Sequence, residues 1–252
     1  WIDKPIDVIS TGEILIDMIS KQMNSPLSET KDFQRFLGGS PANVAFNLQA
    51  LKANVSFIGS IGQDGMGEFM LKCFQDKNLS SEGLHQCENA PTSIILVSKT
   101  SGTPDFLPYL EAYFQIHDNQ FDESLLQQAK VFHTSCFALS KKPAQDSILN
   151  AAKKAKRFGA EVSIDLNYAS KIWPDKADAQ AVVGKFLKLN PLLKISEDDV
   201  ARFLGKSLKH QEIFDYFQHK YSLNRIYLTL GSAGVKYVDK HGKIIHIPAQ
   251  PV

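Results

Sequence analysis

Strand-like and helix-like segments alternate along almost the whole of this 252-residue chain. Apolar runs rich in β-branched residues predict strands, and apolar residues three and four positions apart predict helices. The predicted strands cover 8–19 (interrupted at Gly12), 55–61, 92–98, 131–135, 162–165, 192–196, 226–230, 235–239 and 243–247. The predicted helices cover 41–51, 66–77, 143–158 and 213–221. This alternation predicts an α/β fold, in which helices flank a central, mostly parallel sheet.

Two segments depart from this pattern. Residues 21–33 are polar, and residues 100–108 are rich in Gly, Pro and Thr, so both are predicted to leave the main sheet and to form a second small sheet or flap. The last two predicted strands form a hairpin that turns at Lys240-His241-Gly242. Ligands of open parallel sheets bind beyond the carboxyl ends of the strands, so we expect functional side chains just after predicted strands.

Charge and composition exclude several classes of function. Lys and Arg total 28 against 27 Asp and Glu, a net charge of +1, which predicts neither a nucleic-acid partner nor an anionic membrane. No apolar run reaches the roughly 18 residues of a transmembrane helix. The three cysteines (Cys73, Cys87 and Cys136) are too few and too far apart for a disulfide framework. Together with the absence of a signal-peptide pattern, they predict a cytoplasmic protein.

A glycine pair, Gly38 and Gly39, stands before the first predicted helix. Ser40 is expected to cap this helix and Pro41 to occupy its first turn. A helix N-terminus offers N–H groups to an electron-rich ligand, and the Asn43 amide can donate to and accept from a sugar hydroxyl. The alternative interpretation is a strand-to-helix turn that simply packs tightly.

Six motifs along the chain together resemble the ribokinase-like (pfkB) carbohydrate kinases. They are Gly12-Glu-Ile-Leu-Ile-Asp17, Gly38-Gly-Ser-Pro-Ala-Asn-Val-Ala45, Phe57-Ile-Gly-Ser-Ile-Gly-Gln-Asp-Gly-Met-Gly67, Asp165-Leu-Asn-Tyr168, Leu193-Lys-Ile-Ser-Glu-Asp198 and Thr229-Leu-Gly-Ser-Ala-Gly234. They occur in the family's order and span nearly the whole chain. The runs NPLLKISEDD and IWPD are most similar to the fructokinase-like branch.

The resemblance implies a single ribokinase-like α/β domain over residues 1–252, with a small β-sheet lid. The lid segments are expected at roughly 14–37 and 92–117. By analogy with such lids, two subunits are expected to pair through this sheet as a homodimer.

The resemblance also implies a sugar site. The residues expected there are Asp17, Gly38, Gly39, Asn43, Tyr109, Asp165 and Asn167. For Asp17 the alternative is a solvent-facing strand end, and for Asp165 it is a carboxylate that stabilises a turn. Tyr109 belongs to an aromatic group with Phe106, Tyr113 and Phe114, which either stacks on the sugar or forms an apolar patch under a loop. We expect Asp64 to be a helix cap, and His133 and Cys136 to pack in the core.

The resemblance also implies a nucleotide site. ATP is expected along Lys194, Thr229, Gly231 and Gly234, and Glu197 is expected to order the water around Mg²⁺. For Glu197 the alternative is a capping pattern, with Ser196 followed by acidic residues at a helix start. The glycines alternatively form an ordinary turn between strands.

Three departures from the family pattern carry information. Ala169 replaces the usual Arg, which favours a neutral sugar over a sugar acid unless Lys171 or Lys194 compensates. Lys52 replaces a Gly at a helix end, so we expect a differently built turn there. The Asp-Thr-x-Gly-Ala-Gly-Asp motif, which carries the catalytic base and the anion hole, is absent from these 252 residues. No catalytic residue is therefore assigned in the chain, and the base is expected beyond Val252.

The resulting prediction is an ATP-dependent sugar kinase that transfers the γ-phosphoryl group to a hydroxyl of a monosaccharide, with fructose preferred. One alternative is a kinase for 2-dehydro-3-deoxygluconate or an inositol-derived keto acid. An alternative of another class is a sugar- or nucleotide-binding module without catalysis, prompted by the missing motif.

Overall fold

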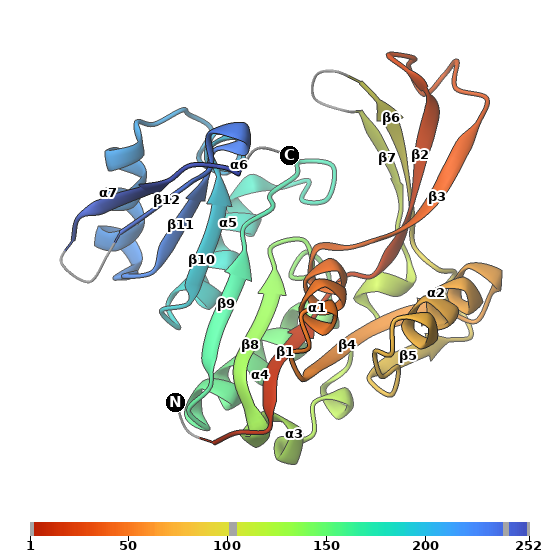
Figure 1. The fold of residues 1–252 in the computed structure, drawn as a ribbon, viewed down its shortest axis with the longest axis horizontal. Coiled ribbons are helices and arrows are strands. Elements are labelled where there is room, and N and C mark those ends of the chain that lie inside the picture. The colour runs from red at the N-terminus through yellow and green to blue at the C-terminus, as the bar shows by residue number, and fades with distance from the viewer. Residues whose placement is uncertain (1–2, 101–104, 239–241, 251–252) are drawn as a thin grey trace.

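The chain builds two sheets, a large central one and a small one that projects from it (Figure 1). The computed structural model describes residues 3–100, 105–238 and 242–250. The central sheet has nine strands in the order β13-β12-β11-β10-β9-β8-β1-β4-β5. Their bounds are β1 (Ile6–Thr11), β4 (Val55–Gly62), β5 (Leu84–Cys87), β8 (Ala129–Ser135), β9 (Glu161–Asp165), β10 (Leu192–Ser196), β11 (Ile226–Thr229), β12 (Val235–Val238) and β13 (Ile244–Ile247).

All pairings from β5 across to β11 are parallel, and β12 and β13 add an antiparallel edge. The predicted mostly parallel sheet and the terminal hairpin are thus confirmed. Two residues of the predicted hairpin turn, Lys240 and His241, lie outside the described residues. The chain places β4 on one side of β1 and β8 on the other, so the strand order reverses at β1. Such a reversal is where open α/β sheets bind their ligands.

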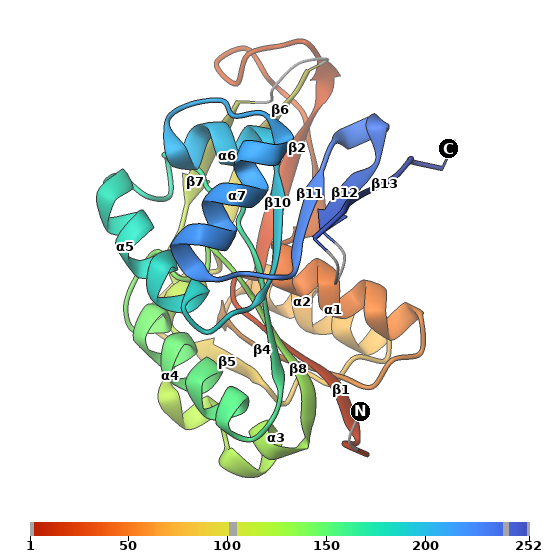
Figure 2. The same ribbon diagram turned by 90° about the vertical axis from the view of Figure 1, so that its left-hand side faces the viewer.

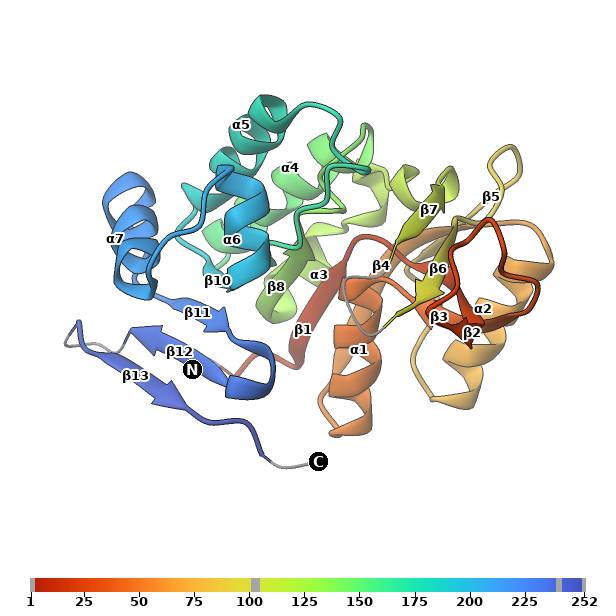
Figure 3. The same ribbon diagram turned by 90° about the horizontal axis from the view of Figure 1, so that it is seen from above.

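Helices cover both faces of the central sheet (Figures 2 and 3). One face carries α1 (Ser40–Ala50) and α2 (Gly65–Asp76). The other carries α3 (Glu123–Gln128), α4 (Ala144–Arg157), α5 (Lys176–Leu187), α6 (Glu197–Leu204) and α7 (His210–Tyr221). The main core lies between these last helices and the sheet, and a smaller core lies under α1 and α2. No helix within the described residues is long and apolar enough to cross a membrane.

The small sheet has the strand order β3-β2-β6-β7. Its strands are β2 (Leu15–Met23), β3 (Phe33–Gly38), β6 (Ile94–Lys99) and β7 (Phe106–Tyr109). β2 pairs with β3 in the antiparallel sense and with β6 in the parallel sense, and β6 and β7 are antiparallel. The chain enters this sheet from β1 and passes from β3 directly into α1, so the base of the sheet lies beside the carboxyl end of β1.

Gly12 divides the predicted run 8–19 into two strands of different sheets. Its φ of +141° is unfavourable for other residues, and an added Cβ would stand 2.7 Å from the Ala138 Cβ. The chain therefore turns here from the central sheet into the small one.

Lys52 corrects one expectation. We expected a differently built turn because a lysine is costly in the left-handed conformation, yet Lys52 adopts φ +65° directly after α1. Its N–H donates to the Gln49 carbonyl, so the usual helix-terminating turn forms around a non-glycine residue.

Candidate functional site at the carboxyl ends of the strands

Several sites predicted from separate motifs meet at one edge of the central sheet. The register pairs Ser135 at the end of β8 with Asp165 at the end of β9, and Asp165 with Lys194 on β10. It also pairs Ser196 at the end of β10 with Thr229 at the end of β11. Since parallel strands end at the same edge, these side chains form a polar row beside the base of the small sheet, which steps by two residues along β10 between Lys194 and Ser196.

Asp17 lies on β2, at the base of the small sheet. Burial alone raises the pKa of its carboxyl group from 3.8 to about 6. Among the described residues, no hydrogen bond or ion pair reaches this carboxylate. A partly buried carboxylate without a partner has free acceptor capacity, which suits the hydroxyl groups of a sugar.

The glycine pair packs against its own chain. A Cβ on Gly38 would stand 2.2 Å from Oδ2 of Asp17, and a Cβ on Gly39 would stand 2.2 Å from the Glu13 carbonyl oxygen. Gly39 also has φ +104°. Both glycines are therefore needed for the close approach of β2 and of the turn that precedes it, in agreement with the tight-packing interpretation.

Ser40 was predicted to cap α1, but the structure shows that it does not. Gly39 occupies the cap position without a side-chain bond, and Ser40 is the first residue of the helix, so Pro41 stands within the first turn as expected. The Ser40 N–H, expected to be open to a ligand, donates to Oε1 of Glu13 at 3.1 Å. The Asn43 side chain is exposed on the first turn, close to this helix start.

Glu13 was not singled out from the sequence, although it belongs to the first motif. Its carboxylate is buried at 1% exposure and accepts a hydrogen bond from Ser135 Oγ at 2.5 Å as well as from Ser40. Burial raises its pKa to about 7, against the lowering effect of these two bonds. The only sequence signal available was an acidic residue directly after a strand end. A glutamate that precedes apolar residues does not reveal that its side chain is buried.

Asp165 is held from two sides. Oδ2 accepts a hydrogen bond from Ser40 Oγ at 2.8 Å, and Oδ1 lies 2.9 Å from the Lys194 ammonium nitrogen. Lys194, predicted to approach the nucleotide phosphates, is thus paired with Asp165 in this structure. Asn167 stands nearby and accepts from the Phe137 N–H at 3.1 Å, which holds the loop after β8.

Glu197 begins α6, with Ser196 as the N-cap that accepts from the Asp199 N–H. The Glu197 carboxylate is half-exposed and lies 2.7 Å from His210 Nε2. His210 Nδ1 in turn lies 2.7 Å from the Lys236 ammonium, a donor only. The imidazole therefore carries its proton on Nε2 and donates it to Glu197. Because His210 is the first residue of α7, the start of this helix orients the Glu197 carboxylate.

The glycine turn after β11 combines open and crowded positions. Gly231 has φ +57° and no neighbour within 4 Å of an added Cβ, so its backbone is accessible to a ligand. Gly234 has φ +97°, and an added Cβ would stand 2.1 Å from the Ile247 carbonyl oxygen, so it serves packing against the segment that follows β13. Thr229 is the last residue of β11, where it lies beside Ser196 of β10.

Tyr109 does not join the group around Asp17. The register pairs Asp17 with Ile95 and Ile95 with Pro108, so Tyr109, one position further along β7, projects from the opposite face of the small sheet. Phe106, two residues before Pro108, shares the face of Asp17. The other two aromatic residues, Tyr113 and Phe114, belong to the short helix Ala112–Phe114 that follows β7, and Tyr113 is buried there.

Lys171 links the loop after β9 to the small sheet. Its ammonium lies 2.6 Å from Asp105 Oδ1 and 2.6 Å from the Phe106 carbonyl oxygen. It comes from the loop after β9, and its partners are the first residue of β7 and the residue directly before it. Lys171 is therefore committed to holding the small sheet, and it is not free to replace the missing arginine at Ala169.

Three other residues have the structural roles expected of them. Asp64 caps α2 and also accepts from the Thr92 N–H and hydroxyl. Burial raises its pKa, but these four bonds outweigh burial and hold the pKa below its usual value. His133 and Cys136 are buried.

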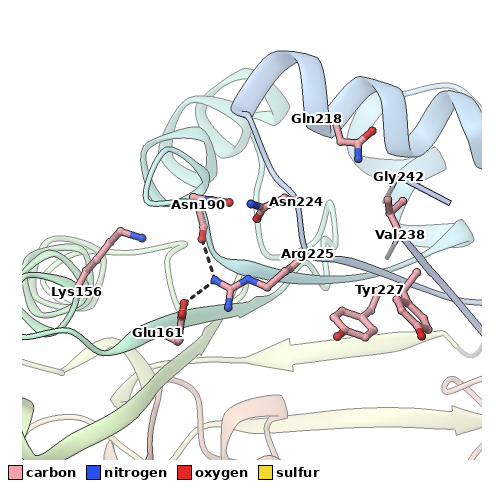
Figure 4. Close-up of a pocket in the computed structure, with 10 residues that line it drawn as sticks. Lys156, Glu161, Asn190, Gln218, Asn224, Arg225, Tyr227, Val238 and Gly242 are labelled. Carbon is pink, nitrogen blue, oxygen red and sulfur yellow. Dashed lines mark hydrogen bonds and ion pairs between the residues drawn. The ribbon is translucent and has the colours of Figure 1, made fainter. Parts of the chain in front are cut away.

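A pocket of about 760 Å³ lies away from this edge (Figure 4). Its lining includes Glu161 at the start of β9 and Arg225 just before β11, which form an ion pair at 2.6 Å. These are the amino ends of the strands, opposite the polar row. None of the predicted site residues lines the pocket, so we do not place the site there.

Known proteins resemble this chain in sequence and in fold. A family model described as "pfkB family carbohydrate kinase" matches residues 6–252. The chain is 30% identical over 232 residues to an ATP-dependent 6-phosphofructokinase of Thermoanaerobacterium thermosaccharolyticum, covering 92% of this chain and 71% of that protein. It is 28% identical over 243 residues to fructokinase-2 of Oryza sativa subsp. japonica, covering 95% and 72%.

Solved structures share the fold. The fructokinase of Halothermothrix orenii superposes with a TM-score of 0.89 at 36% identity, covering 97% of this chain and 86% of that chain. An uncharacterized sugar kinase of Pyrococcus horikoshii in complex with ATP superposes with a TM-score of 0.84 at 25% identity, covering 97% and 78%.

Proposed function

This chain belongs to the pfkB family of carbohydrate kinases, and from that premise we propose that it transfers the γ-phosphoryl group of ATP to a hydroxyl group of fructose. The proposal is supported by the fructokinases of O. sativa and H. orenii among its relatives. The sugar would bind between Asp17, Asn43 and Asp165, with the glycine pair, Gly38 and Gly39, holding the backbone close to Asp17.

The observation that carries the choice of sugar is the pairing of both nearby lysines. Lys194 lies 2.9 Å from Asp165 and Lys171 lies 2.6 Å from Asp105. With Ala169 in place of arginine, the site then offers carboxylates and amides without an uncommitted cation among these positions. Such groups suit neutral hydroxyls, whereas a sugar acid requires a cation.

The nucleotide is proposed to lie along the turn at Thr229, Gly231 and Gly234, with Lys194 on the phosphate side. The open backbone at Gly231 fits this role. Glu197 offers a half-exposed carboxylate to hydrated Mg²⁺, which takes one or two carboxylates and retains several waters. Bound Mg²⁺ would neutralise charge on the phosphates during transfer.

We propose that the small sheet acts as a lid, with lid segments at roughly 14–37 and 92–117 of a single domain over residues 1–252. Four large apolar side chains are exposed on its strands: Met23, Phe36, Leu107 and Tyr109. Leu107 and Tyr109 share one face of this sheet, and exposed apolar side chains on one face favour pairing of two subunits through it. Sedimentation of the protein should then give a dimer, and Leu107→Lys should give a monomer.

The free cysteines are consistent with a cytoplasmic location.

A coupled assay of ADP release tests the proposed reaction. The panel contains fructose, fructose 6-phosphate and 2-dehydro-3-deoxygluconate, since one relative is a 6-phosphofructokinase. We expect the highest kcat/KM with fructose. A higher value with the acid would reassign the substrate, and sugar binding by calorimetry without any ADP release would favour a binding module without catalysis.

A further inference from the structure

We propose that Glu13 is a positioning residue for the sugar site, which holds the turn before α1 against the ends of β8 and β9 so that Asp17 and Asp165 keep a fixed spacing. This inference rests on the proposed function, because it concerns the same sugar.

The side chain of Glu13 joins three segments that are far apart in sequence. It leaves the link between β1 and β2, accepts from the Ser40 N–H at the start of α1, and accepts from Ser135 Oγ at the end of β8. The Ser135 hydroxyl also accepts from the Ala138 N–H at 3.0 Å, which fixes its orientation. The carboxylate is therefore the common contact of the lid connection, the helix start and the sheet edge.

The same network continues to the second carboxylate. Ser40, whose N–H is held by Glu13, donates its hydroxyl to Asp165, and Asp165 pairs with Lys194. A shift of Ser40 would thus move the partner of Asp165. Through Ser40, Glu13 acts on the residue expected to face the sugar from the sheet.

The backbone of Glu13 acts on the other carboxylate. Its carbonyl oxygen lies 2.2 Å from the position that a Cβ on Gly39 would take, and the adjacent Gly38 packs in the same way against Asp17. Glu13 and Asp17 are four residues apart on one segment, and each contacts one glycine of the pair. The position of the β2 segment relative to the helix start is therefore set at both points.

A buried glutamate is energetically unfavourable for a merely structural contact at this place. Burial raises its pKa to about 7, and the negative charge of Asp165 acts in the same direction. Lys194 pairs with Asp165, and Tyr113 and Cys136 are the other titratable groups that the charge of Glu13 affects. Carboxylates with strongly raised pKa values concentrate at functional sites.

The test compares Glu13→Ala with Glu13→Gln in the full protein. Glu13→Ala should raise the KM for fructose by about 10-fold or more, because a buried bond to a charged group is lost, and should leave the KM for ATP within about 2-fold. Glu13→Gln retains volume and an oxygen for the Ser40 N–H, so it should return the KM for fructose to within about 3-fold of the wild type. If Glu13→Ala does not fold, Ser135→Ala removes one of the two bonds and should raise the KM for fructose by about 3-fold.

Asp122→Ala is the matched control. Asp122 caps α3 through the Ser124 N–H at 3.1 Å, beside the amino end of β8 and therefore at the opposite end of the strands from the sugar site. Both alanine variants should lower the unfolding midpoint, and only Glu13→Ala should change the KM for fructose. Equal effects of Glu13→Ala on both KM values, an unchanged KM for fructose, or no rescue by glutamine would overturn the proposal.

Hydrogen exchange separates this proposal from the assignment of the sugar. In the protein without ligands, Glu13→Ala should lose exchange protection at the start of α1, and Glu13→Gln should keep it. If no sugar is phosphorylated by the wild type, the proposed function fails; unchanged protection in Glu13→Ala would refute the role of Glu13 in either case.

Discussion

Replacing Asp17 by asparagine should make the protein more stable at pH 8 and at the same time abolish sugar binding. Asp17 is partly buried without a partner among the described residues, and its pKa is raised from 3.8 to about 6. The difference corresponds to about 3 kcal/mol by which the folded protein disfavours the ionised form. Asparagine has nearly the same shape and no charge, so it removes this penalty.

The sign of the pH dependence follows from the same values. A group whose pKa is higher in the folded state contributes stability that is fully present below its unfolded pKa of about 4 and is lost as the pH rises through about 6. Between pH 4.5 and pH 8, the wild type should therefore lose about 2 kcal/mol of unfolding free energy through Asp17. Glu13 adds a loss of the same sign, but it is common to the wild type and the variant and cancels in their difference.

Urea unfolding at pH 4.5 and pH 8, followed by circular dichroism, measures this difference. Asp17→Asn should exceed the wild type by about 2–3 kcal/mol at pH 8 and by much less at pH 4.5. Asp64→Asn is the control of opposite sign, because hydrogen bonds hold the pKa of Asp64 below its usual value, so this variant should be less stable at pH 8. A stability gap for Asp17→Asn that is the same at both pH values, or a KM for fructose equal to that of the wild type, would refute the reasoning.

Three further outcomes are expected. Lys52→Gly should raise the unfolding free energy by about 1 kcal/mol, since a lysine at φ +65° is replaced by a residue that tolerates it; calorimetry measures this, and an unchanged melting temperature would contradict it. Gly38→Ala should destabilise the protein and raise the KM for fructose, because the new Cβ would stand 2.2 Å from Asp17. Gly65→Ala is the control, since there is open space around its Cβ, and it should leave both stability and KM unchanged. Equal effects of the two substitutions would count against this packing argument. Glu197→Gln should raise the Mg²⁺ concentration needed for half-maximal activity by about 10-fold or more, while the KM for fructose stays the same, and an unaltered Mg²⁺ titration would remove Glu197 from the metal site.

The order of elements could be predicted because periodicity is a local property of the sequence. The parallel sheet and the terminal hairpin were confirmed on that basis. α5 was missed because Gly184 and several alanines weaken its apolar pattern, and β5 was missed because it has only four residues, two of them exposed. The division of the first predicted strand at Gly12 depends on contacts with Ala138, more than 100 positions away in sequence, which no local pattern records.

The candidate site could be located from the sequence but not resolved into partners. The motifs indicated Asp17, Asp165 and Lys194 separately, and only the strand register shows that the last two form an ion pair. The face of a lid residue also depends on register, which is why Tyr109 was grouped with Phe106 in sequence and lies on the other face of the sheet. Glu13 escaped notice because burial of a charged side chain contradicts its usual preference for the surface.

The glycine pair explains why these residues must act together. A bare backbone before a helix invites the interpretation that a ligand touches it, yet the atoms closest to Gly38 and Gly39 belong to Asp17 and Glu13. The absence of side chains thus allows two carboxyl-bearing residues of one segment to approach the helix start. One of them, Glu13, spends its acceptor capacity within the protein, and the other, Asp17, keeps it free. Because the fixed carboxylate restrains the segment that carries the free one, a substitution at either glycine should impair folding and sugar affinity together, with no variant at these two positions affecting affinity alone.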